Sequence, residues 1–141
     1  MIITLLIWFA VFLIPAWFLQ LIIHECSHAV SAVLQGYKVT GVYPYPHKID
    51  GHLYFARCAV EGLPYPAKPE NIFFAAPLLG ATLPILFIPG AIPFTANVLP
   101  VMGALLAMWV MAAGDVIWWM RGYWWGSNTC DGKRFRYGDV V

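Results

Sequence analysis

The sequence predicts a mainly α-helical membrane protein, with three transmembrane helices and a small membrane-associated β-hairpin between the first two. Of its 141 residues, 61% are hydrophobic and only 11% are charged, whereas soluble domains are nearer a quarter charged. The mean hydropathy is +0.71, and three apolar segments are long enough to cross a bilayer. We therefore expect residues 1–141 to form a single membrane-embedded domain without an added soluble module.

The first predicted span covers about residues 5–35, and Gly36 follows it as a helix-ending residue. One helix from Ile2 to Gln35 would be about 51 Å long, at about 1.5 Å per residue. The hydrocarbon core of a bilayer is only about 30 Å thick. The helix must therefore tilt, protrude or kink, and Pro15 is where we expect a kink.

A β-hairpin is predicted at about residues 37–60, close to the membrane surface. Val, Tyr, Phe and Leu are frequent on both sides of the turn-forming pair Asp50-Gly51. Pro44 and Pro46 interrupt the first strand, which favours an edge position for at least part of it.

The second and third spans are predicted at about residues 71–89 and 98–120. The second contains several helix-breaking residues, so we expect it to be bent: Pro77, Gly80, Pro84, Pro89 and Gly90. Such breaks are tolerated in membranes where neighbouring groups or water satisfy the freed backbone atoms. The third span carries Asp115, and a tail of residues 121–141 follows it.

The basic residues predict the orientation of the spans. All eight lie in the 36–70 loop or after Met120: Lys38, Lys48, Arg57, Lys68, Arg121, Lys133, Arg134 and Arg136. By the positive-inside rule, the side that holds the loop and the tail is cytoplasmic. We therefore expect the N-terminus to lie outside, and the hairpin, the tail and the opening of a nearby site to face the cytoplasm.

The first span contains the motif His24-Glu25-Cys26-Ser27-His28, an H-E-x-x-H. Ionisable side chains are costly inside a membrane, so they usually have a partner and a function. Positions four residues apart share a helix face, so both histidines can bind one Zn²⁺ ion. Glu25 lies where a metalloprotease has its general base.

Asp115 is the candidate third ligand, because its predicted depth overlaps that of the motif. By helical rise, His24, His28 and Asp115 lie about 16, 10 and 9 Å from the cytoplasmic end. Two imidazoles and one carboxylate would leave zinc an open fourth position for water, as in catalytic sites. The alternative for Asp115 is an acid at a helix end that pairs with Arg121.

The motif in a membrane helix, Asp115 in a later span and the hairpin between them resemble the site-2 protease family of intramembrane zinc metalloproteases. The resemblance covers about residues 12–121. It implies that His24, His28 and Asp115 bind zinc and that Glu25 is the catalytic acid and base. It also implies a membrane protein or peptide as substrate, cleaved within or near a transmembrane segment. That family usually has glycine after the aspartate, where this chain has Val116.

Two rival functions follow from the same residues. A metal-handling membrane protein without proteolytic activity would want polar groups across the whole bilayer, and the far half of the predicted spans offers almost none. An inactive, protease-like scaffold would not need Glu25. The net charge of +1 gives no sign of a nucleic-acid partner. The expected partners are the lipid bilayer and a transmembrane substrate, and the oligomeric state stays open.

Overall fold

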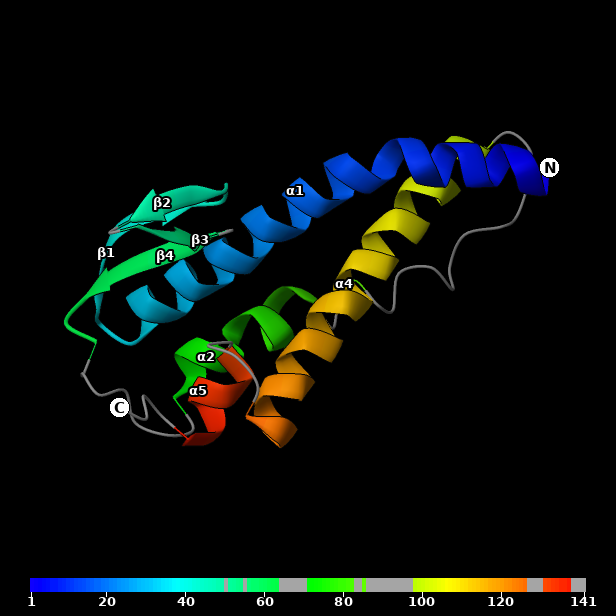
Figure 1. Cartoon of the computed structure of the whole chain (residues 1–141). Helices are drawn as coiled ribbons and strands as arrows, with labels where there is room; N and C mark the ends of the chain where they lie inside the picture. Colours follow the sequence, from blue (N-terminus) through cyan, green and yellow to red (C-terminus); the bar gives the residue numbers. More distant parts are fainter. Residues whose placement is uncertain are drawn as a thin grey trace.

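Two long helices dominate the computed structural model, with short helices and paired strands gathered at one end (Figure 1). The structure describes residues 1–49, 51–54, 56–63, 71–82, 85, 98–126 and 131–137. In chain order the elements are α1 (Ile2–Leu34), β1 (Lys38–Tyr43), β2 (His47–Ile49), β3 (His52–Tyr54), β4 (Arg57–Glu61), α2 (Ile72–Pro77), the π-helix η1 (Leu78–Thr82), α4 (Leu99–Trp125) and α5 (Asp131–Tyr137).

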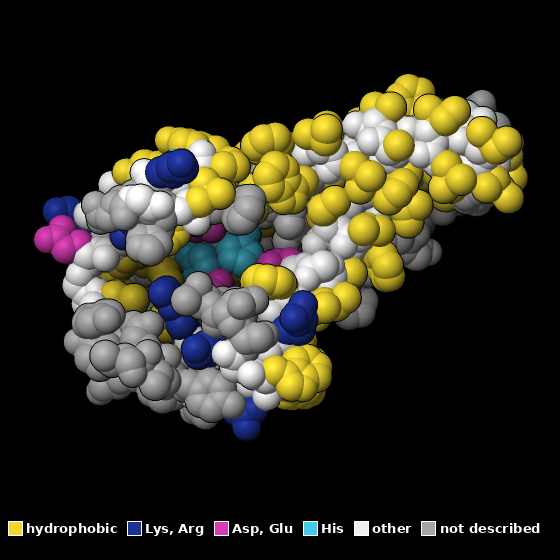
Figure 2. Space-filling model, viewed as in Figure 1, with side chains coloured by type: hydrophobic (Ala, Val, Ile, Leu, Met, Phe, Trp, Pro, Cys, Tyr) yellow, Lys and Arg dark blue, Asp and Glu magenta, His cyan; other side chains and the backbone are white. Residues whose placement is uncertain are grey.

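Helices α1 and α4 are long and apolar enough to cross a membrane. Large apolar side chains on both remain exposed, among them Leu6 and Ile14 on α1 and Val101 and Ile117 on α4. Figure 2 shows hydrophobic side chains covering this long arm of the molecule on the face in view. Extended apolar surface of this kind marks contact with lipid or with another protein, and it agrees with a membrane protein.

Helix α1 continues through Pro15 without interruption, and Figure 1 shows it bending in its N-terminal half. It ends as the sequence predicts, because Gly36 adopts a left-handed conformation with φ of 80°. The N–H of Tyr37 then turns back to the carbonyl oxygen of Ala32 at 2.9 Å. This turn directs the chain into the sheet.

Helices α1 and α4 run in the same direction, since Gly103 lies against Trp8 while Asp115 lies against Gln20. A Cβ atom on Gly103 would lie 2.6 Å from the Cβ of Trp8, so glycine permits the close approach. Ala107, four residues on, is fully buried. From this contact the two helices diverge, and the short elements lie at the wide end (Figure 1).

Because α1 and α4 start at the same end, the chain between them must return along the molecule. The predicted second span, 71–89, falls on this segment. The structure describes residues 71–82 and 85 of it, as α2 and then η1. A complete third span is thus not shown, and the rest of the prediction lies outside the described residues. The last span is longer than predicted, reaching Trp125 before Gly126 ends it with φ of 60°.

Antiparallel strands occupy the region of the predicted hairpin. β1 pairs with β4, from Lys38 opposite Glu61 to Tyr43 opposite Arg57. β2 pairs with β3, and Gly51 lies between them with φ of 81°. The inner pair β2–β3 and the outer pair β1–β4 are nested around Gly51, so the chain forms the predicted hairpin with its pairing divided into two short ladders.

A small core ties these elements together. It consists of Ala32 from α1 and Phe73 and Phe74 from α2. Partly buried side chains pack against it: Tyr37, Val39, Val60, Leu63 and Phe135. Phe135 belongs to α5, so the segment expected as a cytoplasmic tail folds back onto the body of the protein.

Candidate metal centre

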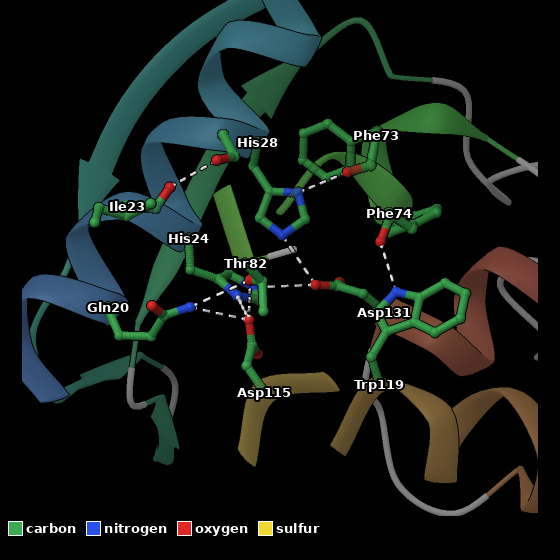
Figure 3. Close-up of polar contacts among 11 residues, drawn as sticks. Gln20, Ile23, His24, His28, Phe73, Phe74, Thr82, Asp115, Trp119 and Asp131 are labelled. Carbon is green, nitrogen blue, oxygen red and sulfur yellow. Dashed lines mark hydrogen bonds and ion pairs between the residues drawn. The ribbon is translucent and has the colours of Figure 1, made fainter. Parts of the chain in front are cut away.

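His24, His28 and Asp131 meet where α1 faces the first residue of α5 (Figure 3). The Oδ2 atom of Asp131 lies 3.2 Å from Nε2 of His24 and 2.9 Å from Nε2 of His28. Within the described part of the chain, these three residues offer ligand atoms that all lie within 4.8 Å of one another. That spacing is close enough for one metal ion to contact all three.

The Nδ1 atom of each histidine already has a hydrogen-bond partner within the protein. Nδ1 of His28 lies 2.7 Å from the carbonyl oxygen of Phe73, which can only accept a hydrogen bond, so this Nδ1 carries the proton. Nδ1 of His24 lies 3.1 Å from Oδ2 of Asp115, a carboxylate that accepts in the same way. A neutral imidazole has one N–H, so a neutral ring held in this way would present the lone pair of its Nε2 to Asp131.

Two neutral rings in this arrangement would need a cation, either a proton or a metal ion, between each Nε2 atom and the Asp131 oxygen. Two imidazolium ions would meet this need, but their ring centroids would be 5.0 Å apart in a partly buried site, which is costly. The donor set of two imidazole nitrogens and one carboxylate oxygen is one that Zn²⁺ accepts. The residues present therefore fit a zinc ion.

This geometry differs from the predicted ligand set of His24, His28 and Asp115. Both histidines stand where the motif predicts, on one face of α1. Asp115 also reaches the site, but it contacts the side of the His24 ring away from Asp131. Asp131, rather than Asp115, completes the cluster of candidate ligand atoms among the described residues. The alternative pairing of Asp115 with Arg121 is not among the contacts described for Asp115.

Pro77 frees the carbonyl that holds His28. In an α-helix the carbonyl oxygen of Phe73 would accept from the N–H four residues later, but Pro77 has no N–H. The next carbonyl, that of Phe74, is also released, because the N–H of Leu78 turns to Ala75. Nε1 of Trp119 on α4 takes its place, 2.9 Å from the Phe74 oxygen. The break in α2 thus supplies the acceptors that link it to α1 and α4.

Helix α5 is held by contacts that place Asp131. Its Phe135 ring lies 5.6 Å from that of Trp119 on α4, and Nη1 of Arg136 donates to the carbonyl oxygen of Tyr123 at 2.9 Å. Burial raises the pKa of Asp131, but with no metal bound the charge of a protonated His28 and the hydrogen bonds from protonated His24 and His28 outweigh it and keep that pKa below its usual range. Asp131 is therefore ionised and can offer a carboxylate oxygen to a cation.

Glu25 lies in the same pocket as the three metal-site residues, and only 6% of it is exposed. The pocket is also lined by residues of β4, including Arg57 and Cys58. Burial and then the charge of Glu25 raise the pKa of the Cys58 thiol to about 11. Figure 2 shows histidine surface at the floor of a hollow on this side, with basic side chains around it. The site is thus open at the end of the protein that holds the sheet.

A local signal for Asp131 was present in the sequence. Gly132 follows it, and an aspartate followed by glycine is what the resemblance to site-2 proteases implies for the third ligand. No protein-family model, curated protein or solved structure matches this chain.

Proposed function

We propose that this protein is an intramembrane zinc metalloprotease, similar to the site-2 proteases, that hydrolyses peptide bonds within or near transmembrane segments. His24, His28 and Asp131 are its zinc ligands, and Glu25 is its general base. One observation carries the proposal: both Nε2 atoms point at a single oxygen of Asp131 while both Nδ1 atoms have acceptors of their own. Such an arrangement prepares a metal site before the metal arrives.

The position of Glu25 favours a catalytic metal site over a purely structural one. It is a buried carboxylate in an apolar helix and lines the pocket of the candidate ligands, which is an expensive placement without a task. When bound, zinc supplies Lewis-acid chemistry that polarises the scissile carbonyl and acidifies water. Glu25 accepts a proton from the attacking water and donates it to the leaving amine as the C–N bond breaks.

The position of strand β4 favours a substrate that binds in an extended conformation along its edge. Among the described strands β4 pairs only with β1, and its residues from Arg57 to Val60 line the same pocket as Glu25. A transmembrane helix hides its carbonyls in backbone hydrogen bonds, so it must unwind before hydrolysis. Pairing of the unwound segment with β4 would hold it extended beside the site.

The orientation of the protein is part of the proposal. The described basic residues, such as Lys38, Arg57 and Arg121, lie at the site end of the molecule, whereas the opposite end, with Met1 to Phe12, has no charged side chain. By the positive-inside rule the hollow and α5 face the cytoplasm, and the N-terminus lies outside.

The test compares Glu25→Gln with wild type in detergent-purified protein, with zinc content and cleavage of a transmembrane reporter measured together. We expect wild type to bind one zinc and cleave, and Glu25→Gln to keep zinc but lose cleavage by about 100-fold or more. Glu61→Gln is the matched control, because Glu61 pairs with Lys38 on the exposed face of the sheet.

The outcomes separate the rival functions. Wild-type protein that binds no zinc refutes the metal site. Zinc without cleavage of any transmembrane reporter refutes the protease and supports a metal-binding membrane protein or an inactive scaffold. Cleavage by Glu25→Gln at the wild-type rate refutes the role of Glu25.

A further inference from the structure

Asp115 accepts three hydrogen bonds at one oxygen (Figure 3). Its Oδ2 lies 3.1 Å from Nδ1 of His24, 2.8 Å from Oγ1 of Thr82 and 3.3 Å from Nε2 of Gln20. The donors come from α1 and η1, and Asp115 comes from α4. Three converging donors fix both the position and the acceptor character of this oxygen.

The other two donors to this oxygen, Gln20 and Thr82, are buried side chains. Gln20 is 5% exposed and Thr82 is fully buried, and the Gln20 amide also donates to the Thr82 hydroxyl at 3.2 Å. The Oε1 atom of Gln20, also buried, has no hydrogen-bond partner among the described residues. An unsatisfied buried acceptor costs free energy. A side chain placed only for packing would not need to bear this cost. We therefore attribute the position of Gln20 to the hydrogen bonds that its amide donates.

We propose that Asp115 is a positioning residue for the metal site and not a ligand, and that Thr82 and Gln20 hold it in place. Asp115 keeps the His24 proton on Nδ1 and fixes the ring so that Nε2 faces Asp131. Metal-binding histidines are commonly oriented by a carboxylate on their other nitrogen, and loss of such a partner weakens metal binding. The inference rests on the proposed zinc site.

The competing explanation is that the network only joins three helical segments, since hydrogen bonds between polar side chains also stabilise contacts between membrane helices. The two roles differ in what a variant changes. If the link is purely structural, its loss lowers zinc affinity only as far as it lowers folding stability. If the link positions His24, its loss lowers zinc affinity and lets the His24 ring change tautomer even where the fold persists.

The test uses Asp115→Asn, Thr82→Val and Thr82→Ser in full-length protein in detergent. Zinc affinity is measured by competition with a chelator, and thermal unfolding is followed by circular dichroism. Gly103→Ala is the matched control, because it disturbs the packing of α1 against α4 at Trp8, away from the site. In addition, ¹⁵N NMR of histidine-labelled, metal-free protein, recorded as a pH series that extends until His24 is neutral, reports the tautomer of that ring.

We expect Asp115→Asn to weaken zinc binding about 10- to 100-fold and to mix the two His24 tautomers. Thr82→Val should weaken it roughly 2- to 10-fold, the effect of one hydrogen bond, and Thr82→Ser should restore it. Gly103→Ala should lower the unfolding temperature without changing zinc affinity.

The positioning role is overturned if Asp115→Asn binds zinc as tightly as wild type, or keeps the Nδ1–H tautomer. It is also overturned if every variant, Gly103→Ala included, loses zinc affinity in proportion to stability. If Asp115→Asn abolishes zinc binding while Asp131→Ala retains it, Asp115 is a ligand after all. Wild-type protein without zinc affinity refutes the metal site itself, and the positioning role with it.

Discussion

Nδ1 of His28 lies 2.7 Å from the carbonyl oxygen of Phe73, and the two rings stack with centroids 4.5 Å apart. The carbonyl is available because Pro77 offers no N–H to it. A residue that weakens α2 thus creates the acceptor that orients a candidate ligand on α1. Proline breaks in membrane helices commonly leave carbonyls for neighbouring groups to satisfy, and here that neighbour belongs to the site.

The first prediction follows from this relationship. Pro77→Ala restores a backbone N–H that competes with His28 for the Phe73 oxygen, so zinc affinity should fall about 10- to 100-fold. The helix itself should become no less stable, since proline is removed from its interior. Chelator competition and thermal unfolding measure the two effects. Pro100→Ala is the control, because proline in the first turn of α4 replaces no helical donor. Unchanged zinc affinity in Pro77→Ala would contradict the assignment.

The second prediction ranks the two aspartates. Asp131→Ala removes the proposed third ligand and should weaken zinc binding by more than the roughly 10- to 100-fold expected for an outer partner such as Asp115. A chain truncated after Gly126 lacks α5 altogether and should behave like Asp131→Ala. Both are compared with Asp115→Asn by chelator competition. Tighter zinc binding by Asp131→Ala than by Asp115→Asn would reverse the assignment.

The histidine pair could be predicted from spacing along the sequence, whereas the place of Asp131 beside it could not. His24 and His28 are four residues apart on one helix, so local geometry alone brings them together. Asp131 reaches them only because the chain ends α4 at Gly126 and folds α5 back onto Phe73 and Trp119. That return depends on packing between distant elements, which spacing along the sequence does not encode.

The depth argument placed Asp115 near His24, and the structure brings the two side chains together. Helical rise places a residue along the membrane normal, and Asp115 does lie beside His24. It cannot tell which ring nitrogen faces which carboxylate. The role of Pro77 was equally hidden, because a free carbonyl becomes meaningful only when its partner on α1 is known. Long apolar helices were the easiest part to predict, since composition alone defines them.

The third prediction concerns the contact between α1 and α4. In Gly103→Ala the new methyl group would lie 2.6 Å from the Cβ of Trp8 and 2.9 Å from the backbone nitrogen of Phe9. Backbone must shift to admit it, so the free energy of unfolding should fall by about 1–3 kcal/mol. Thermal unfolding in detergent measures the loss. Ala104→Gly, at the neighbouring position, is a control for the helix propensity of the two residue types. A variant as stable as wild type would mean that the helices do not approach this closely.

The last prediction is a pH profile for Cys58. The thiolate is the reactive form, and burial together with the Glu25 charge raises the pKa of Cys58 to about 11. The thiol therefore stays neutral across the physiological range. In a Cys26→Ser/Cys130→Ser background, the rate of alkylation should still be rising about tenfold per unit at about pH 10, whereas an ordinary thiol levels off above about 8.5. Glu25→Gln removes the neighbouring charge and should move the profile toward lower pH. If the profile of Cys58 levels off near that of a free thiol and ignores Glu25→Gln, then β4 does not cover the site and cannot hold a substrate beside it.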